Sequence, residues 1–434
     1  MNFSGQAGRE AERRVFLFLQ GHPSSFPRKL ADELERHGHE ALRINLCAGD
    51  ALYWCGRSAT SYRGFFRNWR SFLRGFIKRK GVSDILYYGD RRPYHAVAAE
   101  LARELGINAF TYEFGYLRPD WITVERDGMS GHSHFPDDPA LIRKIAAHFD
   151  PPDMVRRYPY SKASELFNEV TYNLSTFFSP FLFPFYKADR YYNLLVEYIS
   201  GIPGLFLEKR NHRQAQALID NVLRDRQSYF LFPLQLQNDY QLQRNTPFRH
   251  QGEAIDIVLR SFSKAAPPDD LLIVKLHPLD NGWERWPRVV ADLSRKYGVF
   301  GRVRTIQGGD LDVLIENTRG CVQINSTVGM YALQAGCPVK ALGTAIYDIE
   351  GLCHHGPLDG FWTNPPVPDS ALVTALVTAL AGTVQVKGNF FTAEGQAAAI
   401  PQMARMLIDG RVNGAGAFVD PPPRLKRKRV TVPN

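Results

Sequence analysis

The stretch LLIVKLHP occupies residues 271–278 of this 434-residue chain. Five of its first six residues are aliphatic, which predicts a strand buried on both faces of a parallel sheet. The strand ends on Lys275, His277 and the chain-turning Pro278. Ligands of open α/β sheets bind just beyond the carboxyl ends of the strands, so an anion such as phosphate is one expected occupant. The other interpretation also stands: Lys275 is a strand-end charge and His277 is a loop residue that caps a helix.

Similar apolar segments recur along the chain, with amphipathic segments between them. Strands are expected at residues 15–20, 41–45, 84–90, 109–115, 229–235, 271–276, 300–306, 320–325 and 338–342, and helices at residues 26–37, 94–105, 253–264 and 327–335. Strands that alternate with helices predict βαβ units and parallel sheets. Two such series in succession favour an α/β fold with the GT-B layout, in which two Rossmann-like domains face each other across a cleft.

The expected domains follow from the places where this alternation breaks. The first Rossmann-like domain covers residues 1–210, with an aromatic-rich helical insertion at about 151–205. The second covers residues 211–390. A C-terminal helix in 391–419 is expected to pack back on the first domain. The tail 420–434 has four prolines and five Lys or Arg residues, so we expect it to be disordered.

Composition restricts the class of protein. The net charge of +9 favours an acidic partner: nucleic acid, an anionic membrane surface or a phosphorylated substrate. The five cysteines are scattered and form no CxxC pair, which indicates neither a disulfide framework nor a zinc site and fits a reducing cytoplasm. The N-terminus is polar, without the apolar run of a signal peptide. The most apolar stretch, 177–186, carries two prolines and is too short to span a bilayer. A soluble or peripheral protein is expected.

A second candidate for anion binding is the segment Asn325–Gly329, where a strand meets a helix. Ser326 and Thr327 suit the helix N-cap, and free backbone N–H groups at such a position bind anions. Helix capping alone explains either hydroxyl in isolation. Together with Lys275 and His277, a site for one or two phosphates is the better interpretation, since the chain has no P-loop motif.

Two carboxylates are candidates for chemistry. Glu113 ends an expected strand and precedes Gly115, which permits close approach, and Arg118, which suits a sugar carboxylate. A Glu113–Arg118 ion pair that stabilises a loop is the equal alternative. Asp239 follows the strand at 229–235 in an amide-rich loop, where an Asx-turn is its ordinary role. On opposite walls of a cleft, Glu113 and Asp239 form the carboxylate pair that retaining glycosyl transfer by double displacement needs.

The segment Arg57–Lys80 contains eight Lys or Arg residues and no acid, with aromatic residues at roughly helical spacing. One-sided charge over such a length favours contact with an anionic membrane, with Arg67, Trp69, Arg70 and Arg74 as candidates. A solvated helix whose aromatic residues pack on its own domain is the alternative. Nucleic-acid binding has no recognised motif to support it.

In order and spacing, these segments resemble the capsule polysaccharide biosynthesis proteins of the KpsS/LipB type. The resemblance runs from about Val15 to about Leu407 and rests on YEFGYLRPD at 112–120, PLQ at 233–235 with Asp239, KLHP at 275–278, NSTVG at 325–329 and GTAIYDIEGL at 343–352. It implies a retaining β-Kdo transferase of GT-B-like fold. The implied donor is CMP-Kdo, and the acceptor is a phosphatidylglycerol-type lipid at the cytoplasmic face of the bacterial inner membrane, where the first Kdo starts the poly-Kdo linker of a capsular polysaccharide.

The resemblance also implies roles for residues. The first domain becomes the acceptor side and the second the nucleotide-sugar side, with Asp239 as nucleophile and Glu113 as base. The donor nucleotide and its phosphate are bound by Lys275, His277, Pro278, Asn325, Ser326, Thr327 and Gly329. The sugar carboxylate or acceptor is bound by Arg118, Gly115 and Gln235. Other capsule biosynthesis and export proteins are implied partners, and nucleic acid is not.

We expect neither cofactor nor metal. CMP leaves with a single phosphate, which a His/Lys/hydroxyl site neutralises without a metal. The one Asp-x-Asp spelling considered, Asp310–Asp312, is expected to start a helix. Two alternatives remain open at this point: another CMP-sugar transferase, such as a sialyltransferase, and a non-catalytic glycolipid-binding component of capsule export.

Overall fold

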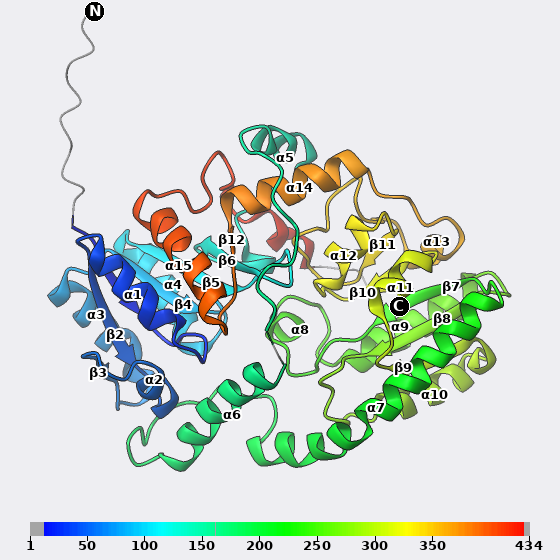
Figure 1. Cartoon of the computed structure of the whole chain (residues 1–434), viewed down its shortest axis with the longest axis horizontal. Coiled ribbons are helices and arrows are strands. Elements are labelled where there is room, and N and C mark those ends of the chain that lie inside the picture. Colours follow the sequence, from blue (N-terminus) through cyan, green and yellow to red (C-terminus); the bar gives the residue numbers. More distant parts are fainter. Residues whose placement is uncertain (1–12, 161, 429–434) are drawn as a thin grey trace, which may run out of the picture.

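The computed structural model describes residues 13–160 and 162–428 and contains two β-sheets in separate halves of the molecule (Figure 1). The larger sheet has the strand order β12-β6-β5-β4-β1-β2-β3, and the smaller has the order β11-β10-β7-β8-β9. The strands are β1 (Val15–Phe18), β2 (Glu40–Asn45), β3 (Thr60–Ser61), β4 (Asp84–Tyr88), β5 (Asn108–Phe114), β6 (Trp121–Arg126), β7 (Tyr229–Pro233), β8 (Leu271–Leu276), β9 (Val303–Gln307), β10 (Cys321–Gln323), β11 (Val339–Ala341) and β12 (Gln385–Lys387).

The larger sheet is parallel from β3 to β5, as the alternating pattern predicted. Its helices are α1 (Phe26–Arg36), α2 (Ala48–Tyr53), α3 (Trp69–Lys80) and α4 (Pro93–Leu105). Of these, α1, α3 and α4 cover the sheet with apolar faces, and α2 packs against α6 (Lys162–Phe178). The sequence pattern did not predict β6, which follows β5 after a short loop and pairs antiparallel with it. An antiparallel neighbour needs only such a loop, whereas a parallel one needs a long crossover.

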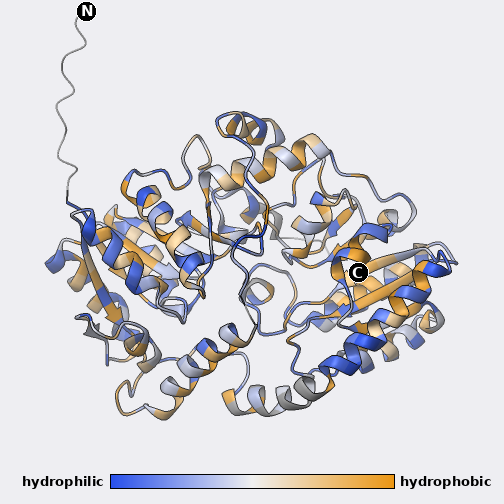
Figure 2. Ribbon diagram, viewed as in Figure 1, coloured by the Kyte–Doolittle hydropathy of each residue, from blue (hydrophilic) through white to orange (hydrophobic). Residues whose placement is uncertain are grey.

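The smaller sheet is parallel throughout. Its flanking helices are α9 (Gln251–Ala265), α10 (Trp286–Lys296), α11 (Leu311–Asn317), α12 (Val328–Gln334), α13 (Leu358–Thr363) and α14 (Ser370–Thr383). All six residues of β8 are buried, which confirms the prediction for Leu271–Leu276. Figure 2 shows the same distribution of hydropathy, with apolar strands inside and polar outer faces on the helices. The two Rossmann-like halves of the expected GT-B-like α/β fold are both present.

The expected helical insertion consists of α6 (Lys162–Phe178) and α7 (Leu194–Arg224), which run along the lower edge of the molecule in Figure 1. α7 continues past the expected domain boundary at residue 210 and packs against β9 of the smaller sheet. Two short helices lie close to the junction of the halves: α5 (Pro139–Ala146), which packs on α14, and α8 (Tyr240–Arg244).

The chain returns to the first half near its C-terminus. β12 pairs with β6, so residues 385–387 belong to the larger sheet although they lie inside the expected second domain. α15 (Ala393–Ile408) packs on α1, where a returning C-terminal helix was expected. Residues 423–428, expected within a disordered tail, form the 3₁₀-helix η4. Arg424 anchors it, because its buried guanidinium donates to the backbone carbonyls of Phe135, Pro136 and Ile346. Residues 429–434 lie outside the described part.

None of the helices in the described residues combines the length and the apolar character that crossing a bilayer requires.

Candidate functional site

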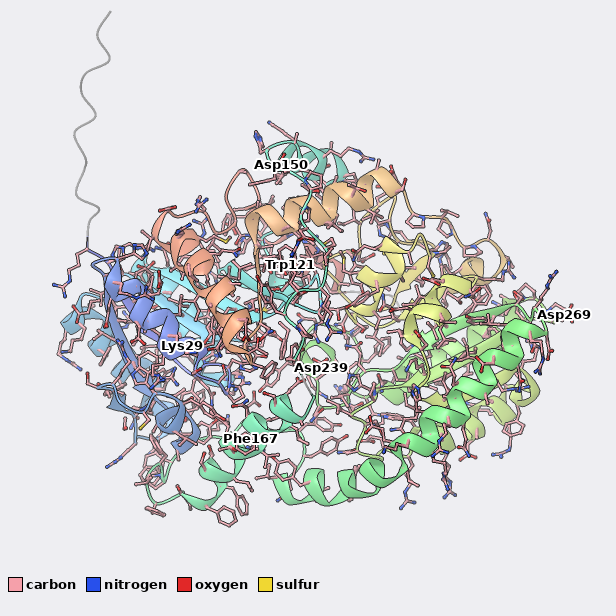
Figure 3. The ribbon with its side chains drawn as sticks, in the orientation of Figure 1. Lys29, Trp121, Asp150, Phe167, Asp239 and Asp269 are labelled. Atoms are coloured by element: carbon pink, nitrogen blue, oxygen red, sulfur yellow. The ribbon has the colours of Figure 1, made fainter. Side chains whose placement is uncertain are left out.

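Glu113 and Asp239 come from opposite halves and influence each other electrostatically. Glu113 is the penultimate residue of β5, and Asp239 immediately precedes α8, at the centre of the molecule in Figure 3. Burial raises the pKa of Glu113 to about 7, and the negative charge of Asp239 is the next largest cause. Arg118 opposes this rise. A carboxyl group with a pKa near neutrality is suited to general acid–base catalysis. The structure therefore brings the two predicted carboxylates within electrostatic reach.

A narrow crevice of about 40 Å³ joins the two halves beside Glu113. Glu113 and Arg118 line it from the first half, and Asn325 and Thr327 line it from the second. Four of the predicted site residues thus share one cavity. The crevice is far smaller than the 300–1,000 Å³ typical of ligand sites, so a nucleotide sugar enters only if the crevice widens.

Arg118 is exposed, and its guanidinium lies 4.9 Å from the centroid of the Phe114 ring. The stack holds the cation at the edge of the crevice. Gly115 lies behind it, with its backbone N–H bonded to the carbonyl of Trp121 at 2.8 Å. A Cβ at residue 115 would come within 2.5 Å of that carbonyl oxygen, so the close approach of β5 and β6 requires glycine.

Gln235 connects two strand ends of the smaller sheet. Its side-chain oxygen accepts from the backbone N–H of Asn325 at 3.2 Å, and its own backbone is bonded through both polar groups to the Gln251 amide at 2.8 and 3.1 Å. The residue is buried. Gln235 was predicted to contact sugar or acceptor; in this structure it positions the segment that carries Asn325.

Ser326, Thr327 and Gly329 surround the start of α12. Ser326 Oγ accepts from the backbone N–H of Val328 at 3.2 Å, which is the helix-capping role left open by the sequence. Thr327 faces the crevice. At residue 329 a Cβ would lie 1.9 Å from Gln323 Nε2, so glycine allows the buried Gln323 amide to pack against the helix.

Lys275 and His277 lie at the end of β8 and are not among the residues that line the crevice. Lys275 is buried, whereas His277 is partly exposed and Pro278 is exposed. His277 Nδ1 accepts from the backbone N–H of Leu279 at 3.1 Å, which places the neutral-state proton on Nε2. β7 separates β8 from β10, so the two strand ends are about 10 Å apart. A phosphate held by both needs the reach of the Lys275 side chain.

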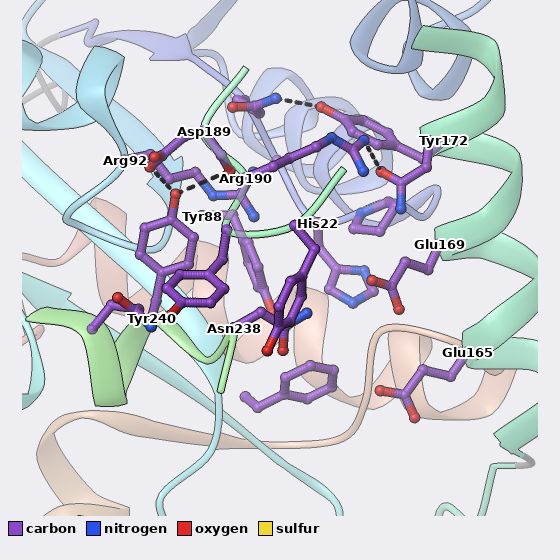
Figure 4. A pocket seen from close by; sticks show the side chains of 18 of the residues that line it. His22, Tyr88, Arg92, Glu165, Glu169, Tyr172, Asp189, Arg190, Asn238 and Tyr240 are labelled. Carbon is purple, nitrogen blue, oxygen red and sulfur yellow. Dashed lines mark hydrogen bonds between the residues drawn. The ribbon is translucent and has the colours of Figure 1, made fainter. Parts of the chain in front are cut away.

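The largest cavity described, of about 530 Å³, lies next to this crevice and was not found from the sequence (Figure 4). It is enclosed by the ends of β1 and β4, the helix α6, the loop 186–192 and the segment at α8. Its polar and aromatic lining includes Gln20, His22, Tyr88, Arg92, Glu165, Glu169, Tyr172, Asn173, Tyr186, Asp189, Arg190, Tyr192, Asn238 and Tyr240. The polar residues after the first strand, 20–22, were the available signal; the contribution of the helical insertion could not be read from its periodicity.

The predicted membrane-contact helix is largely engaged with its own domain. Trp69 is fully buried, and its indole N–H donates to the carbonyl of Tyr94 at 3.0 Å, so its assignment to a membrane surface was wrong. Arg70 and Arg74 pair with Glu104 of α4, and Arg70 also with Glu100. These acids lie far away in sequence, which is why the segment looked one-sided. Only Arg67 of the four candidates remains exposed without such a pair in the described residues.

Asp310 caps α11, with its carboxylate accepting from the N–H groups of Asp312 and Val313, as expected for a helix start. Within residues 13–160 and 162–428, no group of three or more His, Cys, Asp or Glu side chains has an arrangement suited to a metal ion.

The chain is similar to known proteins over most of its length. The family described as capsule polysaccharide biosynthesis protein matches residues 83–391. The chain is 31% identical over 366 residues to the capsule polysaccharide export protein KpsS of Escherichia coli, covering 83% of this chain and 92% of KpsS. It is 29% identical over 388 residues to the capsule polysaccharide modification protein LipB of Neisseria meningitidis serogroup B, covering 87% of this chain and 91% of LipB.

Among solved structures, the β-Kdo 2,7 transferase of Thermosulfurimonas dismutans KpsC aligns with 91% of this chain and 99% of its own, at 12% identity and a TM-score of 0.43. The extent of the family match and the identity to KpsS decide the classification. The chain belongs to the capsule polysaccharide biosynthesis family, and within it to the KpsS/LipB type.

Proposed function

We propose that this protein is a retaining glycosyltransferase that transfers the first β-Kdo from CMP-Kdo to a phosphatidylglycerol-type lipid and so starts the poly-Kdo linker of a capsular polysaccharide. The observation that carries the proposal is the pair Glu113 and Asp239, which come from opposite halves of the molecule. Burial, and after it the charge of Asp239, raises the pKa of Glu113 to about 7. Membership of the capsule biosynthesis family supports the substrate class.

The proposed reaction has two displacements. In the first, an Asp239 carboxylate oxygen bonds to the anomeric carbon of Kdo while the bond from that carbon to the CMP phosphate oxygen breaks, and CMP leaves. In the second, Glu113 takes the proton of the acceptor hydroxyl, whose oxygen bonds to the anomeric carbon as the Asp239 ester bond breaks. Each displacement inverts the anomeric centre, so two restore its configuration.

The donor is held mainly by the second half. Lys275 and His277 supply cationic or N–H donors to the phosphate, and Asn325, Ser326 and Thr327 supply polar groups from the neighbouring strand end. Arg118 suits the Kdo carboxylate, because a guanidinium binds carboxylates through two parallel hydrogen bonds. One phosphate needs no divalent ion in this scheme, so activity is expected to persist in excess chelator; metal-dependent recovery of a lost activity contradicts it.

The proposed place of action is the cytoplasmic face of the inner membrane, where the protein is peripheral and works with other capsule biosynthesis and export proteins. The lipid acceptor requires access to the bilayer.

The test is transfer of Kdo from a CMP-Kdo generating system to a fluorescent phosphatidylglycerol analogue. We expect Asp239→Ala to abolish product, whereas Asp312→Asn, an exposed acid on α11, retains it. In Glu113→Gln the second displacement is slowed, so mass spectrometry should find Kdo attached to the peptide that contains Asp239. No adduct on that peptide argues against double displacement.

The same assay separates the alternatives. Transfer from a CMP-sialic acid donor but not from CMP-Kdo identifies a different CMP-sugar transferase. Binding of a Kdo-bearing glycolipid without turnover of either donor identifies a non-catalytic export component.

A further inference from the structure

The cavity of about 530 Å³ contains a cation that has acids in its surroundings but forms no direct ion pair within the described residues. Arg92 is the N-cap residue of α4, is partly buried, and lines the cavity wall (Figure 4). Its guanidinium lies 5.6 Å from the Tyr88 ring centroid and 5.8 Å from that of Tyr240. Arg92 makes no ion pair within the described part of the chain, whereas Arg43, also near the cavity, is paired with Asp50 at 3.0 Å.

Burial lowers the pKa of Arg92, but surrounding groups that include Asp50 outweigh this effect, so the guanidinium is charged. The two tyrosine rings stabilise the cation through their faces, and a ring face accepts no conventional hydrogen bond from its N–H groups. Arg92 therefore has donors directed to the region where a ligand anion can bind. Arg190 contributes a second cation to the same wall and donates to the Asn173 side chain at 2.7 Å.

The opposite wall suits hydroxyl groups. Glu165 and Glu169 lie one turn apart on α6 and line the cavity, and His22 lies near them. Burial raises the pKa of Glu169, opposed by Arg190 and Arg92. Burial lowers the pKa of His22 to about 3, so the imidazole is neutral. Asp189 accepts from the Tyr240 hydroxyl. Carboxyl and imidazole groups here can exchange hydrogen bonds with hydroxyls, while the acids restrict the ligand's anion to the arginine end.

The cavity adjoins Glu113, the proposed base. A small adjoining crevice of about 30 Å³ is lined by Tyr88, Arg92 and Tyr240, which also line the large cavity, and by Glu113. A phosphate on Arg92 thus lies one side chain away from Glu113, the proposed base.

We propose that this cavity binds the acceptor headgroup, a phosphodiester bearing free hydroxyls, with Arg92 as the phosphate ligand and the α6 wall directing a hydroxyl to Glu113. The assignment rests on the proposed function for the identity of the acceptor, but its test measures binding and needs no transfer.

The experiment is calorimetric titration of the intact protein with dihexanoyl phosphatidylglycerol, and separately with CMP and with free Kdo. Arg92→Gln is expected to weaken lipid binding about ten- to a hundredfold, the loss of one charge-assisted hydrogen-bonded contact, and to leave CMP binding unchanged. Arg92→Lys retains part of the affinity. The matched control is Arg103→Gln, which removes an exposed arginine from the same helix.

Each outcome is decisive. Loss of CMP or Kdo binding instead of lipid binding assigns Arg92 to the donor and overturns the proposal, as does unchanged binding of all three. Because Arg92 forms no direct ion pair within the described residues, Arg92→Gln should lower the melting temperature of the free protein no more than Arg103→Gln does. A larger fall with no effect on binding shows a structural role and overturns the proposal. If the protein binds the lipid through Arg92 but transfers no Kdo, the proposed function fails and this inference stands. If the protein transfers Kdo equally well with Arg92→Gln, the proposed function stands and this inference fails.

A separate observation concerns the outer surface of the same helical insertion. Large apolar side chains are exposed there, with Phe181, Phe167 and Phe178 at 75, 70 and 68%. We name as the aromatic surface Leu166, Phe167, Phe177, Phe178, Phe181, Leu182 and Phe185. It lies at the lower edge of the molecule, where Figure 3 labels Phe167. Contiguous exposed apolar side chains of this kind mark an interaction site.

Cations border the aromatic surface and acids are absent from its central segment. Phe65 stacks on Phe185 with centroids 3.9 Å apart, and the Arg67 guanidinium lies 4.9 Å from the Phe65 ring. Lys187 Nζ lies 4.7 Å from the ring centroid of Phe66. Residues 170–188 contain no Asp or Glu. Apolar aromatic side chains beside Arg and Lys match the interface of an anionic bilayer.

The geometry points to the aromatic surface as the part that inserts into an anionic lipid bilayer, in place of the buried Trp69. Co-sedimentation with vesicles of phosphatidylglycerol and phosphatidylcholine tests it. Phe178→Ser with Phe181→Ser should reduce the bound fraction at least about tenfold, and Phe300→Ser, an exposed phenylalanine in the other half, should not. Unchanged binding overturns the inference. A concentration-dependent dimer that the double variant dissociates, seen by light scattering, assigns the surface to a second copy and also overturns it.

Discussion

The raised pKa of Glu113 predicts a specific pH profile. As the base of the second displacement, Glu113 must be ionised, so the apparent rate follows its ionised fraction. With a pKa of about 7, roughly a tenth of the molecules carry the carboxylate at pH 6 and about nine tenths at pH 8. The value of kcat/KM for the acceptor is therefore expected to rise by up to about tenfold across this range.

The groups that shift the pKa of Glu113 predict in which direction the pH profile moves when each of them is replaced. Arg118 lowers the pKa of Glu113, and Asp90 raises it. Arg118→Gln should therefore move the acidic limb to higher pH, and Asp90→Asn should move it to lower pH. Controls are Arg143→Gln and Asp369→Asn, which remove the partners of an exposed ion pair at 2.6 Å. These should leave the limb in place.

The assay is the initial rate of Kdo transfer at saturating donor and subsaturating acceptor between pH 5 and pH 9, because kcat/KM for the acceptor reports the Kdo-enzyme on which Glu113 acts. In that form the Asp239 ester carries no charge, so the limb lies at or below pH 7. The variants are compared by the midpoint pH of the acidic limb and not by the maximal rate, since Arg118→Gln also weakens donor binding in the proposed mechanism. The reasoning is refuted if the residual rate of Glu113→Gln keeps the same limb, or if the two charge variants shift it in the same direction.

Three further predictions concern stability and the surface. Glu125 is fully buried and accepts a hydrogen bond from the Tyr116 hydroxyl at 2.6 Å, and burial raises its pKa from 4.5 to about 7. Because the folded form binds the proton more tightly, the free energy of unfolding should fall by about 3 kcal/mol as the pH rises from 4.5 to 7. Glu125→Gln should remove that part of the pH dependence in urea titrations, while Glu40→Gln should not. Gly329→Ala places a Cβ 2.4 Å from the buried Tyr347 ring and should lower the free energy of unfolding by about 1–3 kcal/mol. Gly301→Ala, with open space around residue 301, should change the free energy of unfolding little. Equal effects of the two variants contradict the packing argument. Replacing Arg70 and Arg74 by Gln should leave vesicle binding nearly unchanged, because both arginines pair with Glu104, and a large loss in co-sedimentation restores α3 to the membrane contact.

Local pattern was sufficient for the alternating strands and helices. The run at Leu271–Leu276 is apolar because both faces of β8 are covered, and that requirement is visible in the sequence itself. The polar residues after the strands also follow from topology, since parallel strands place their carboxyl ends at one edge. Glu113, Asp239 and Asn325 were identifiable on this basis.

Pairings between distant segments could not be predicted in the same way. The basic segment of α3 lacks acids, but Glu100 and Glu104 reach it from α4, and Trp69 is buried by packing that periodicity does not specify. β12 was missed because it has only three residues and pairs antiparallel with β6 across more than 250 residues of chain. β6 was missed because the expected alternation of strands with helices does not predict a strand directly after β5.

The sequence by itself determined the two Rossmann-like halves and the strand ends that carry Glu113, Asp239, Lys275 and Thr327. Only the tertiary structure decided that Glu113 and Asp239 influence each other, that Thr327 shares a crevice with Arg118 while Lys275 does not line it, and that Arg92 faces a large cavity closed by α6. The reason is physical: burial of one strand is encoded in its own run of apolar residues, whereas the distance between charges on different elements depends on how whole layers pack.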